Sequence, residues 1–330
     1  MTLRPLKKIL VIRFSSIGDI VLTTPVVRCL KNTFPQAEIH FLTKKKFAQV
    51  LAGNPYIDKL HLFDGNFGTM LAQLRNEHFD FVADLHHNLR SLRFKLALRC
   101  PSATFPKLNL RKWWYVHTKR LDVMPNIHIV DRYFDAVKKI GVKNDNLGLD
   151  FFTTPEPDFH IPFGNYIAIV CGATYTTKQI PLQLIYNITR REVYNFVLLG
   201  DKSDGERLDA LPLPFGDNVF NACGKTTLNQ SALMVKNSDA VITSDTGLMH
   251  IAAALDKKTV AVWGNTTPQL GMHPYMPQHP DCFVNIETAG LPCRPCSKLG
   301  YNKCPKGHLN CLKSITADEI TAALEKLLAK

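Results

Sequence analysis

Strand-like and helix-like segments alternate along almost the whole chain. Short apolar runs predict strands in the first half at 8–14, 38–43, 59–63 and 79–85. In the second half they predict strands at 166–171, 195–200, 219–223, 240–245 and 259–264. Helical spacing of apolar residues, as at 20–34, separates most of these runs. Such alternation is typical of parallel sheets covered by helices, so we expect an α/β protein with doubly wound parallel sheets.

The chain of 330 residues is long enough for two domains. A polar, proline-rich segment at 153–158 predicts a linker near the midpoint, which gives domains at 1–156 and 157–330. Ligands of open parallel sheets bind beyond the carboxyl ends of the strands, so we expect the two sheets to face each other across a cleft. Thr316 and Glu319 form a capping-box pattern before a C-terminal amphipathic helix, which we consider able to pack back on the first domain.

No apolar run approaches the roughly 20 residues that a membrane-spanning helix needs. The apolar stretch at 9–12 is too short for a signal peptide and instead predicts the first strand. We therefore expect a cytoplasmic protein whose nine cysteines are mostly reduced thiols.

The net charge of +12 is unevenly distributed. Residues 85–121 contain no Asp or Glu, although they hold nine Lys or Arg, and they include Trp113, Trp114 and Tyr115. Such a basic field raises the local concentration of anionic partners, which here could be nucleic acid, a phosphorylated substrate or an anionic membrane surface. The alternative is a solvated basic face without a specific ligand.

The segment 244–254 joins a predicted strand to a helix rich in small residues. It begins with Ser244, Asp245, Thr246 and Gly247, so a polar turn places unpaired backbone N–H groups at a helix N-terminus. The helix dipole is positive at that end, which favours a phosphate or another anion. We therefore expect a phosphorylated small molecule to bind at this turn.

Two more loops follow predicted strands. Asp19, after the first strand, would face the cleft, where a carboxylate can act as a general base on an incoming hydroxyl. The alternative is that Asp19 only caps the following helix. The loop at 172–178 is rich in hydroxyls and ends in Lys178, which suits a pyrophosphate. A solvated lysine in a turn explains the same pattern.

Four cysteines lie close together in the sequence near the C-terminus. Cys293 and Cys296 form a C-x-x-C pair, and Cys304 and Cys311 follow, with His308 between them. This spacing permits a structural zinc site made of four cysteines, or of three cysteines and the histidine. A disulfide-stabilised loop and simple buried thiols are the alternatives.

Five motifs in this order resemble glycosyltransferase family 9, the ADP-heptose:lipopolysaccharide heptosyltransferases. The resemblance covers nearly the whole chain, and the motifs lie at 9–21, 84–91, 223–228, 244–254 and 260–264. It implies the two-domain glycosyltransferase B architecture. It also implies transfer of a sugar from a nucleotide diphosphate donor, with inversion and with no catalytic metal or other required cofactor.

The resemblance also implies roles for single residues. Asp19 matches the family's general base, and Lys178 matches the lysine on the donor phosphates. The other matches to donor-binding positions are Thr174, Asp245, Thr246, Gly247 and His250.

Two positions of the donor site depart from the family's pattern. Ala173 replaces one of two adjacent threonines, so only Thr174 of that pair remains. The family often has a glutamate that holds the nucleoside two residues after the glycine corresponding to Gly200. This chain has lysine there, so we consider Asp201 or Asp204 as its substitute.

The acceptor that the resemblance implies is an anionic, lipid-linked glycan. Arg90 and Arg93, just after a predicted strand, would hold its phosphates and carboxylates. The acceptor-binding loop after the first strand would contribute Ser15, Ser16 and Gly18. The other basic residues of 85–121 would hold the protein to the inner-leaflet surface of the inner membrane, at roughly 1 kcal/mol per residue near the surface.

ADP-heptose is the donor that we expect, and we expect no nucleic acid partner. Another nucleotide sugar is one alternative. A nucleotide-sugar epimerase of the same fold, which needs no separate acceptor, is a second. A basic nucleic-acid-binding protein is the alternative from a different functional class, and it would leave the anion-binding turn at 244–254 unexplained.

Overall fold

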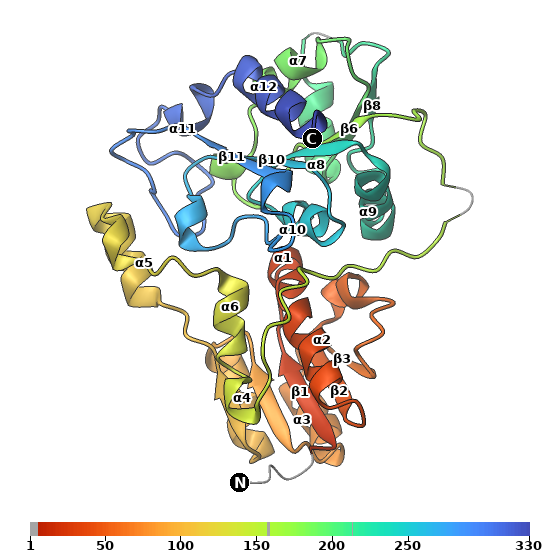
Figure 1. Ribbon diagram of the computed structural model, residues 1–330, viewed down its shortest axis with the longest axis vertical. Helices are drawn as coiled ribbons and strands as arrows, with labels where there is room; N and C mark the ends of the chain where they lie inside the picture. Colours follow the sequence, from red (N-terminus) through yellow and green to blue (C-terminus); the bar gives the residue numbers. More distant parts are fainter. Residues whose placement is uncertain (1–5, 157–158, 213) are drawn as a thin grey trace. The chain divides into compact units, whose positions relative to one another are not determined.

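The computed structural model describes residues 6–156, 159–212 and 214–330 (Figure 1). Its contacts divide the chain into two compact units. Unit 1 comprises Met1–Lys107 and Ile127–Phe152, and unit 2 comprises Leu108–Asn126 and Thr153–Lys330. Leu108–Asn126 thus groups with the C-terminal half, although it lies within the N-terminal half of the sequence. Residues 157 and 158 of the predicted linker lie outside the described residues.

Unit 1 contains a five-stranded parallel sheet with the strand order β3-β2-β1-β4-β5. Its strands are β1 (Lys8–Ile12), β2 (Glu38–Lys44), β3 (Lys59–Phe63), β4 (Phe81–Asp84) and β5 (Ser102–Thr104). The central strand β1 is fully buried from Ile9 to Ile12, as expected of a strand covered on both faces. The sequence does not predict β5 because its three residues form no apolar run.

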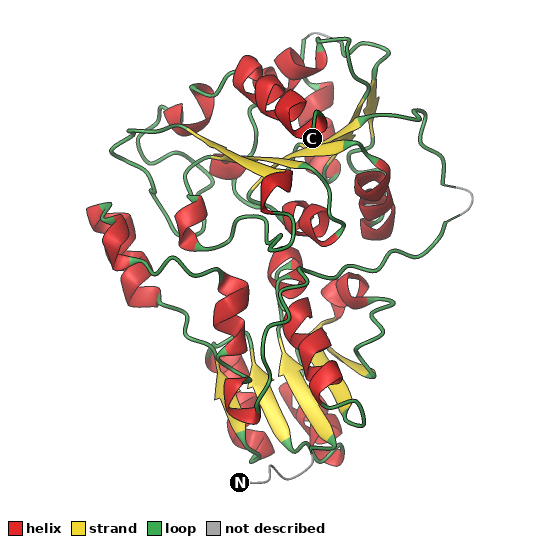
Figure 2. Ribbon diagram, viewed as in Figure 1, coloured by secondary structure: helices red, strands yellow, loops and turns green. Residues whose placement is uncertain are grey.

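Helices lie on both faces of the sheet in unit 1 (Figure 2). They are α1 (Ile17–Val21), α2 (Thr24–Thr33), α3 (Phe67–Asn76), α4 (Leu89–Leu98) and α6 (Ile129–Phe134), with 3-10 helices η1 (Lys45–Leu51) and η3 (Lys138–Ile140). The helical segment predicted at 20–34 is present as α2 and the last residues of α1, with a break between the two helices. Pro25 stands in the first turn of α2. Proline lacks an N–H and clashes with the preceding turn, so one continuous helix cannot pass through it.

Unit 2 contains a six-stranded parallel sheet with the order β11-β10-β9-β6-β7-β8. Its strands are β6 (Ile167–Val170), β7 (Phe196–Leu199), β8 (Val219–Asn221), β9 (Ala240–Ser244), β10 (Thr259–Trp263) and β11 (Phe283–Glu287). The five strands predicted for this half are present, and each is shorter than predicted by one or two residues. The edge strand β11 is not predicted, because its half-buried residues mix apolar and polar types.

Helices of unit 2 also lie on both faces of its sheet, although the first of them lies apart from the sheet (Figure 2). They are α5 (Asn109–Thr118), α7 (Leu182–Thr189), α8 (Lys202–Asp209), α9 (Leu228–Asn237), α10 (Gly247–Ala254), α11 (Asn310–Lys313) and α12 (Ala317–Leu328). Its 3-10 helices are η2 (Leu121–Val123), η4 (Thr176–Lys178), η5 (Pro268–Leu270) and η6 (Pro280–Cys282). The predicted capping box of Thr316 and Glu319 is confirmed at the start of α12. Helix α12 packs against α7, β10 and β11, all in unit 2.

All strand pairs in both sheets are parallel, and helices connect most successive strands. The predicted α/β class with doubly wound parallel sheets is therefore confirmed. Among the residues that the structure describes, no helix combines the length and the apolar character needed to span a membrane.

Candidate active site

Asp19 lies in the first turn of α1, directly after the carboxyl end of β1. Its Oδ2 atom accepts hydrogen bonds from the Ser16 N–H at 3.1 Å and from the Ser16 hydroxyl at 2.9 Å. Its Oδ1 atom lies 2.6 Å from Nη2 of Arg13, and the carboxylate remains partly exposed. Asp19 therefore stabilises the start of α1, and its charged carboxylate stays partly exposed.

Arg13 controls the charge of this carboxylate. Burial would raise the pKa of Asp19, but the charge of Arg13 and the hydrogen bonds from Ser16 lower that pKa below its ordinary value of 3.8. The buried guanidinium also donates to the carbonyls of Ser15 at 2.8 Å and Leu85 at 2.6 Å. Asp19 is thus ionised at neutral pH, the state in which a carboxylate can accept a proton.

Arg90 and Arg93 lie on the exposed side of α4, and aromatic rings support both guanidinium groups. Arg90 is 5.6 Å from the ring centres of Phe14 and Phe63, and Arg93 is 4.3 Å from that of Phe67. Stacking of this kind steadies a guanidinium by its face and leaves its N–H edge available for phosphate or carboxylate. The two arginines predicted to bind the acceptor therefore have a geometry suited to anions.

Near them, a cavity of about 350 Å³ lies at the carboxyl end of β4. It is lined by Asp84, His87, Asn88, Leu89, Leu92 and Lys95. Lys95 Nζ lies 3.2 Å from Asp84 Oδ2, within the same unit. Sequence reasoning did not select this lysine, and the only signal was its place one turn after Arg90 in a helix that follows a strand.

The three loop residues predicted to contact the acceptor differ in accessibility. Ser16 is exposed and Ser15 is partly exposed, but Gly18 is buried. Glycine has no side chain, so any contact from Gly18 is confined to its backbone. The serines are therefore the accessible members of this loop.

Lys178 and Asp245 meet in unit 2. Lys178 stands at the end of η4, Asp245 directly follows β9, and their Nζ and Oδ2 atoms are 2.6 Å apart. Both side chains are mostly buried. The hydroxyl of Thr266 donates to the same Asp245 oxygen at 2.9 Å. Sequence reasoning missed Thr266, which lies in the loop after β10 and has only its position beyond a strand end as a signal.

The turn at 245–247 forms a helix N-terminus, as predicted. Thr246 is the N-cap of α10, and its hydroxyl oxygen accepts from the Met249 N–H at 3.4 Å. The first-turn N–H groups, beginning with Gly247, point out of the helix end and favour an anion. His250 is buried one turn further along. The structure therefore brings Lys178, Asp245 and Thr246 together at the carboxyl edge of the sheet.

The position of Lys178 depends on close backbone packing. A Cβ on Gly264 would lie 2.3 Å from the carbonyl oxygen of Thr177, so only glycine allows the end of β10 to approach η4. The Thr177 hydroxyl also contacts Asn265 Oδ1 at 3.0 Å and donates to the Tyr301 carbonyl at 2.9 Å. These contacts hold the residue before Lys178 on two sides.

The remaining candidate donor residues lie in two other segments of unit 2, the loop after β6 and the start of α8. Thr174 is exposed in the loop after β6. Asp201 is the N-cap of α8, where its carboxylate accepts from the Asp204 N–H at 3.0 Å and the Ser203 hydroxyl at 2.7 Å. Asp204 is buried and lies 2.9 Å from Arg207. Of the two possible substitutes for the missing glutamate, Asp201 is thus exposed and Asp204 is buried.

The sequence model of glycosyltransferase family 9 (heptosyltransferase) matches residues 68–299, more than two thirds of the chain. The protein belongs to this family. The predicted family and the predicted enzyme class, a glycosyltransferase, are therefore confirmed.

Curated relatives of this glycosyltransferase are heptosyltransferases, among them the following two. Lipopolysaccharide heptosyltransferase 2 of Salmonella typhimurium is 25% identical over 296 residues, covering 79% of this chain and 84% of the relative. Lipooligosaccharide heptosyltransferase 2 of Haemophilus influenzae is 34% identical over 141 residues, covering 42% of this chain and 38% of the relative.

Solved structures support the glycosyltransferase B fold. A family 9 glycosyltransferase from Veillonella parvula has a TM-score of 0.78 and 22% identity, covering 100% of this chain and 99% of that one. The E. coli heptosyltransferase WaaC with ADP has a TM-score of 0.69 and 19% identity, covering 97% and 99%. WaaC is also known with ADP-2-deoxy-2-fluoro heptose. At these identities the likeness establishes the fold of the enzyme.

The four C-terminal cysteines of the glycosyltransferase have free thiols. Cys296 Sγ lies 2.9 Å from the Cys293 carbonyl oxygen. Burial would raise the pKa of Cys304, but backbone N–H groups at 306–309 lower it below its ordinary value. In the described part of the chain, no three of these cysteines bring their sulfurs within 4.8 Å of one another. The structure therefore gives the predicted zinc site no assembled ligand set.

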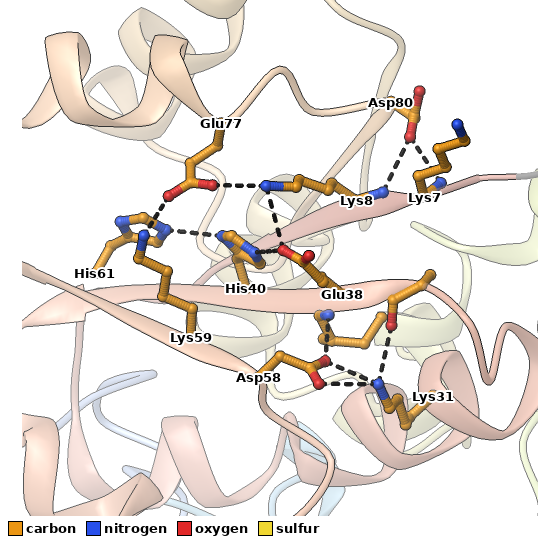
Figure 3. Close-up of polar contacts among 12 residues, drawn as sticks. Lys7, Lys8, Lys31, Glu38, His40, Asp58, Lys59, His61, Glu77 and Asp80 are labelled. Carbon is orange, nitrogen blue, oxygen red and sulfur yellow. Dashed lines mark hydrogen bonds and ion pairs between the residues drawn. The ribbon is translucent and has the colours of Figure 1, made fainter.

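His40, His61 and Glu77 are the described residues whose ligand atoms do lie within 4.8 Å of one another (Figure 3). His40 Nδ1 and His61 Nε2 share a hydrogen bond of 2.9 Å. Both Lys8 and Lys59 pair with Glu77. Two ammonium groups beside the carboxylate would repel a divalent cation, so this cluster at the amino ends of the strands is a hydrogen-bonded network and not a metal centre.

The lowered pKa of His61 in this cluster predicts that the protein loses stability in mild acid. Burial and the neighbouring His40 lower the pKa of His61 from 6.5 to about 4. The unfolded chain therefore takes up a proton before the folded one, and stability present above pH 6.5 falls as the pH drops toward 4. For His61 alone the loss is ~3 kcal/mol at most.

Urea unfolding of wild type and His61→Gln from pH 8 to pH 5 measures this effect. We expect the free energy of unfolding of the variant to fall less steeply with acid, because glutamine does not titrate. His78→Gln, at an exposed histidine, is the matched control and should follow wild type. Parallel curves for wild type and His61→Gln would contradict the assignment.

Proposed function

We propose that this enzyme transfers a heptose, or a related sugar, from an ADP-sugar to a lipopolysaccharide core or a related surface glycan. The observation that carries the proposal is the ion pair of Lys178 and Asp245 beside the N-terminus of α10, a site suited to a diphosphate. Two kinds of finding support the donor and the acceptor: the names of the curated relatives, and the ADP and ADP-sugar analogue bound to E. coli WaaC.

The donor half of the reaction belongs to unit 2. Lys178 and the first-turn N–H groups of α10 would bind the donor's diphosphate and stabilise the charge that it gains on leaving, without a catalytic metal. Asp245 positions Lys178 through their ion pair. The other donor contacts in this proposal come from Thr174, Asp201, Thr246, Gly247 and His250.

The acceptor half belongs to unit 1. An acceptor hydroxyl oxygen attacks the anomeric carbon from the face opposite the diphosphate, and the carbon–oxygen bond to the diphosphate breaks. Asp19 takes the hydroxyl proton as the new bond forms, so ADP leaves with its full negative charge. Attack from the opposite face inverts the anomeric configuration. Arg90 and Arg93 would bind anionic groups of the acceptor.

A lipid-linked acceptor requires the enzyme to work at a membrane surface. We place it at the cytoplasmic face of the inner membrane, as a peripheral protein. The excess of cations in 85–121 supports this location, because anionic lipids attract clusters of Lys and Arg.

A ligand panel tests the donor. Thermal unfolding with ADP, UDP, GDP and their sugars should show selective stabilisation by ADP and ADP-heptose, by ~2.7 kcal/mol at a hundredfold excess over the dissociation constant. Selective stabilisation by UDP or GDP would overturn the ADP assignment. Incubation with ADP-heptose alone should leave the sugar unchanged, and formation of an epimer would identify an epimerase instead.

A further inference from the structure

His86 follows the carboxyl end of β4 in unit 1 and has no part in the transfer proposed above. Strand β4 pairs with β1, with Asp84 opposite Ile12, and the Leu85 N–H donates to the Ile12 carbonyl at 3.1 Å. Parallel neighbours end at the same edge of their sheet, so the loop that begins at Leu85 lies beside the loop that carries Asp19. His86 therefore shares a sheet edge with the candidate base.

Arg13 joins these two loops of unit 1. Its guanidinium pairs with Asp19 and donates to the backbone carbonyl that precedes His86. The His86 ring stands edge-on to Phe14, with 5.2 Å between the ring centres and 86° between the ring planes. Arg90, a predicted acceptor residue, lies 5.6 Å from the centre of the same Phe14 ring. His86 is thus held near the candidate base and near a candidate anion-binding group of the acceptor site.

The two ring nitrogens of His86 have different surroundings. Nδ1 is inaccessible to solvent and has no hydrogen-bond partner among the residues that the structure describes. The side chain as a whole is partly exposed, and Nε2 has neither a partner in the described part of the chain nor the inaccessibility of Nδ1. Nε2 is therefore the nitrogen that a ligand can reach.

The imidazole of His86 is neutral at pH 7. Burial, and then the charges of Arg13 and Lys107, lower the pKa of His86 from 6.5 to about 4. The charges of Asp84 and Asp19 act in the opposite direction and are outweighed. A neutral ring carries one proton, and a buried N–H without an acceptor is costly. The proton therefore belongs on Nε2, which makes His86 a neutral hydrogen-bond donor and leaves proton removal to Asp19.

A neutral donor beside a general base suits a sugar hydroxyl. The attacked hydroxyl must keep an oxygen lone pair for the anomeric carbon, and a donor on that oxygen would lower its nucleophilicity. A neighbouring hydroxyl of the same sugar is free of this constraint. Phosphates and carboxylates of the acceptor are matched better by the guanidinium groups of Arg90 and Arg93. The group that fits His86 is therefore a hydroxyl next to the attacked one.

We propose that His86 is an acceptor-binding residue, whose Nε2–H donates to a hydroxyl of the acceptor sugar next to the attacked hydroxyl. Because two hydroxyls on one sugar ring are fixed relative to each other, this contact turns the attacked hydroxyl toward Asp19. The inference deepens the proposed function and rests on it for a sugar as the acceptor.

Two substitutions distinguish the ring nitrogens. The amide of glutamine reaches the position of Nε2, whereas the amide of asparagine reaches only that of Nδ1. With detergent-dispersed, heptose-free lipopolysaccharide as acceptor, His86→Gln should stay within about threefold of wild type. His86→Asn should lower kcat/KM for the acceptor by about tenfold or more and leave ADP affinity unchanged. His78→Asn, at an exposed histidine of unit 1, is the matched control and should be neutral.

NMR of the protein with isotope-labelled histidine tests the assignment without sugar transfer. The resonances of His86 are identified by their loss in His86→Gln, after thermal unfolding has shown that the variant is folded. We expect the proton on Nε2 at neutral pH. Its resonance should shift when the lipopolysaccharide is added without donor, and inorganic phosphate should not reproduce that shift.

Several results would overturn the role of His86. They are a proton on Nδ1, no shift with lipopolysaccharide, equal impairment of His86→Gln and His86→Asn, or an unimpaired His86→Asn. Protonation of the ring on addition of lipopolysaccharide would show that it binds an anionic group instead, and weaker ADP binding in both variants would assign it to the donor. Absence of transfer from wild type, with the expected shift present, would count against the proposed function and leave the contact of His86 with the glycan standing.

Discussion

Replacing Asp19 with asparagine will lower the transfer rate constant by about 10²- to 10⁴-fold and leave ADP affinity unchanged. Asparagine keeps the size and an acceptor oxygen for Ser16, so the start of α1 is preserved, but it cannot take a proton. Asp19 belongs to unit 1, whereas the candidate diphosphate site belongs to unit 2. Steady-state kinetics and calorimetric titration with ADP measure the two quantities separately.

Two controls separate proton transfer from helix capping at Asp19. Ser16→Ala removes one hydrogen bond to the carboxylate and leaves the base, so it should cost about 1 kcal/mol of stability and retain most of the rate constant at saturating acceptor. Asp122→Asn changes a carboxylate that is exposed and paired with Arg120, and it should be neutral. If Asp19→Asn turned over at the wild-type rate, Asp19 would be a cap and nothing more.

The pH profile gives an independent check on the same group. The pKa of Asp19 lies below its ordinary value, and the reactive form is the carboxylate. The rate constant at saturating substrates should therefore stay flat as the pH falls from 8 to 6.5, above the range in which His61 destabilises the fold. An acidic limb within that range would point to a different base.

Local sequence patterns predicted most strands because apolar runs between polar turns are a property of neighbouring residues. The same patterns selected Lys178 and the 245–247 turn as candidates, because Lys178 lies in the loop after β6 and the turn directly follows β9. They could not predict that Lys178 pairs with Asp245, or that Thr266 joins them, because three separate loops supply these groups. Such contacts depend on strand order, which a single sequence does not contain.

Local sequence patterns also could not predict to which domain the segment Leu108–Asn126 belongs. Its basic and aromatic composition was evident, but its assignment to unit 2 was not. Tyr115 and Thr267 are 152 positions apart, and no local signal joins them. The role of Arg13 was equally hidden, because an arginine at the end of a strand gives no sign that it will fix the charge of Asp19.

Replacing Lys178 with methionine should lower kcat/KM by about 10²- to 10³-fold and weaken ADP binding. Methionine fills most of the lysine's volume without its charge. The variant loses a cation at the leaving diphosphate. It also leaves Asp245 without the partner now 2.6 Å away, so a mostly buried carboxylate would repel the phosphates. Kinetics with varied donor and calorimetry with ADP measure both losses.

Repulsion of the phosphates by the unpaired Asp245 carboxylate makes the prediction specific. In Lys178→Met/Asp245→Asn the unpaired carboxylate is gone, so the double variant should be less impaired than the sum of the two single effects requires, and ADP binding should recover in part. Lys236→Met, at an exposed lysine of α9, is the matched control and should be neutral. Wild-type ADP affinity in Lys178→Met would show that the N-terminus of α10 binds the diphosphate alone, with the lysine acting only as the partner of Asp245.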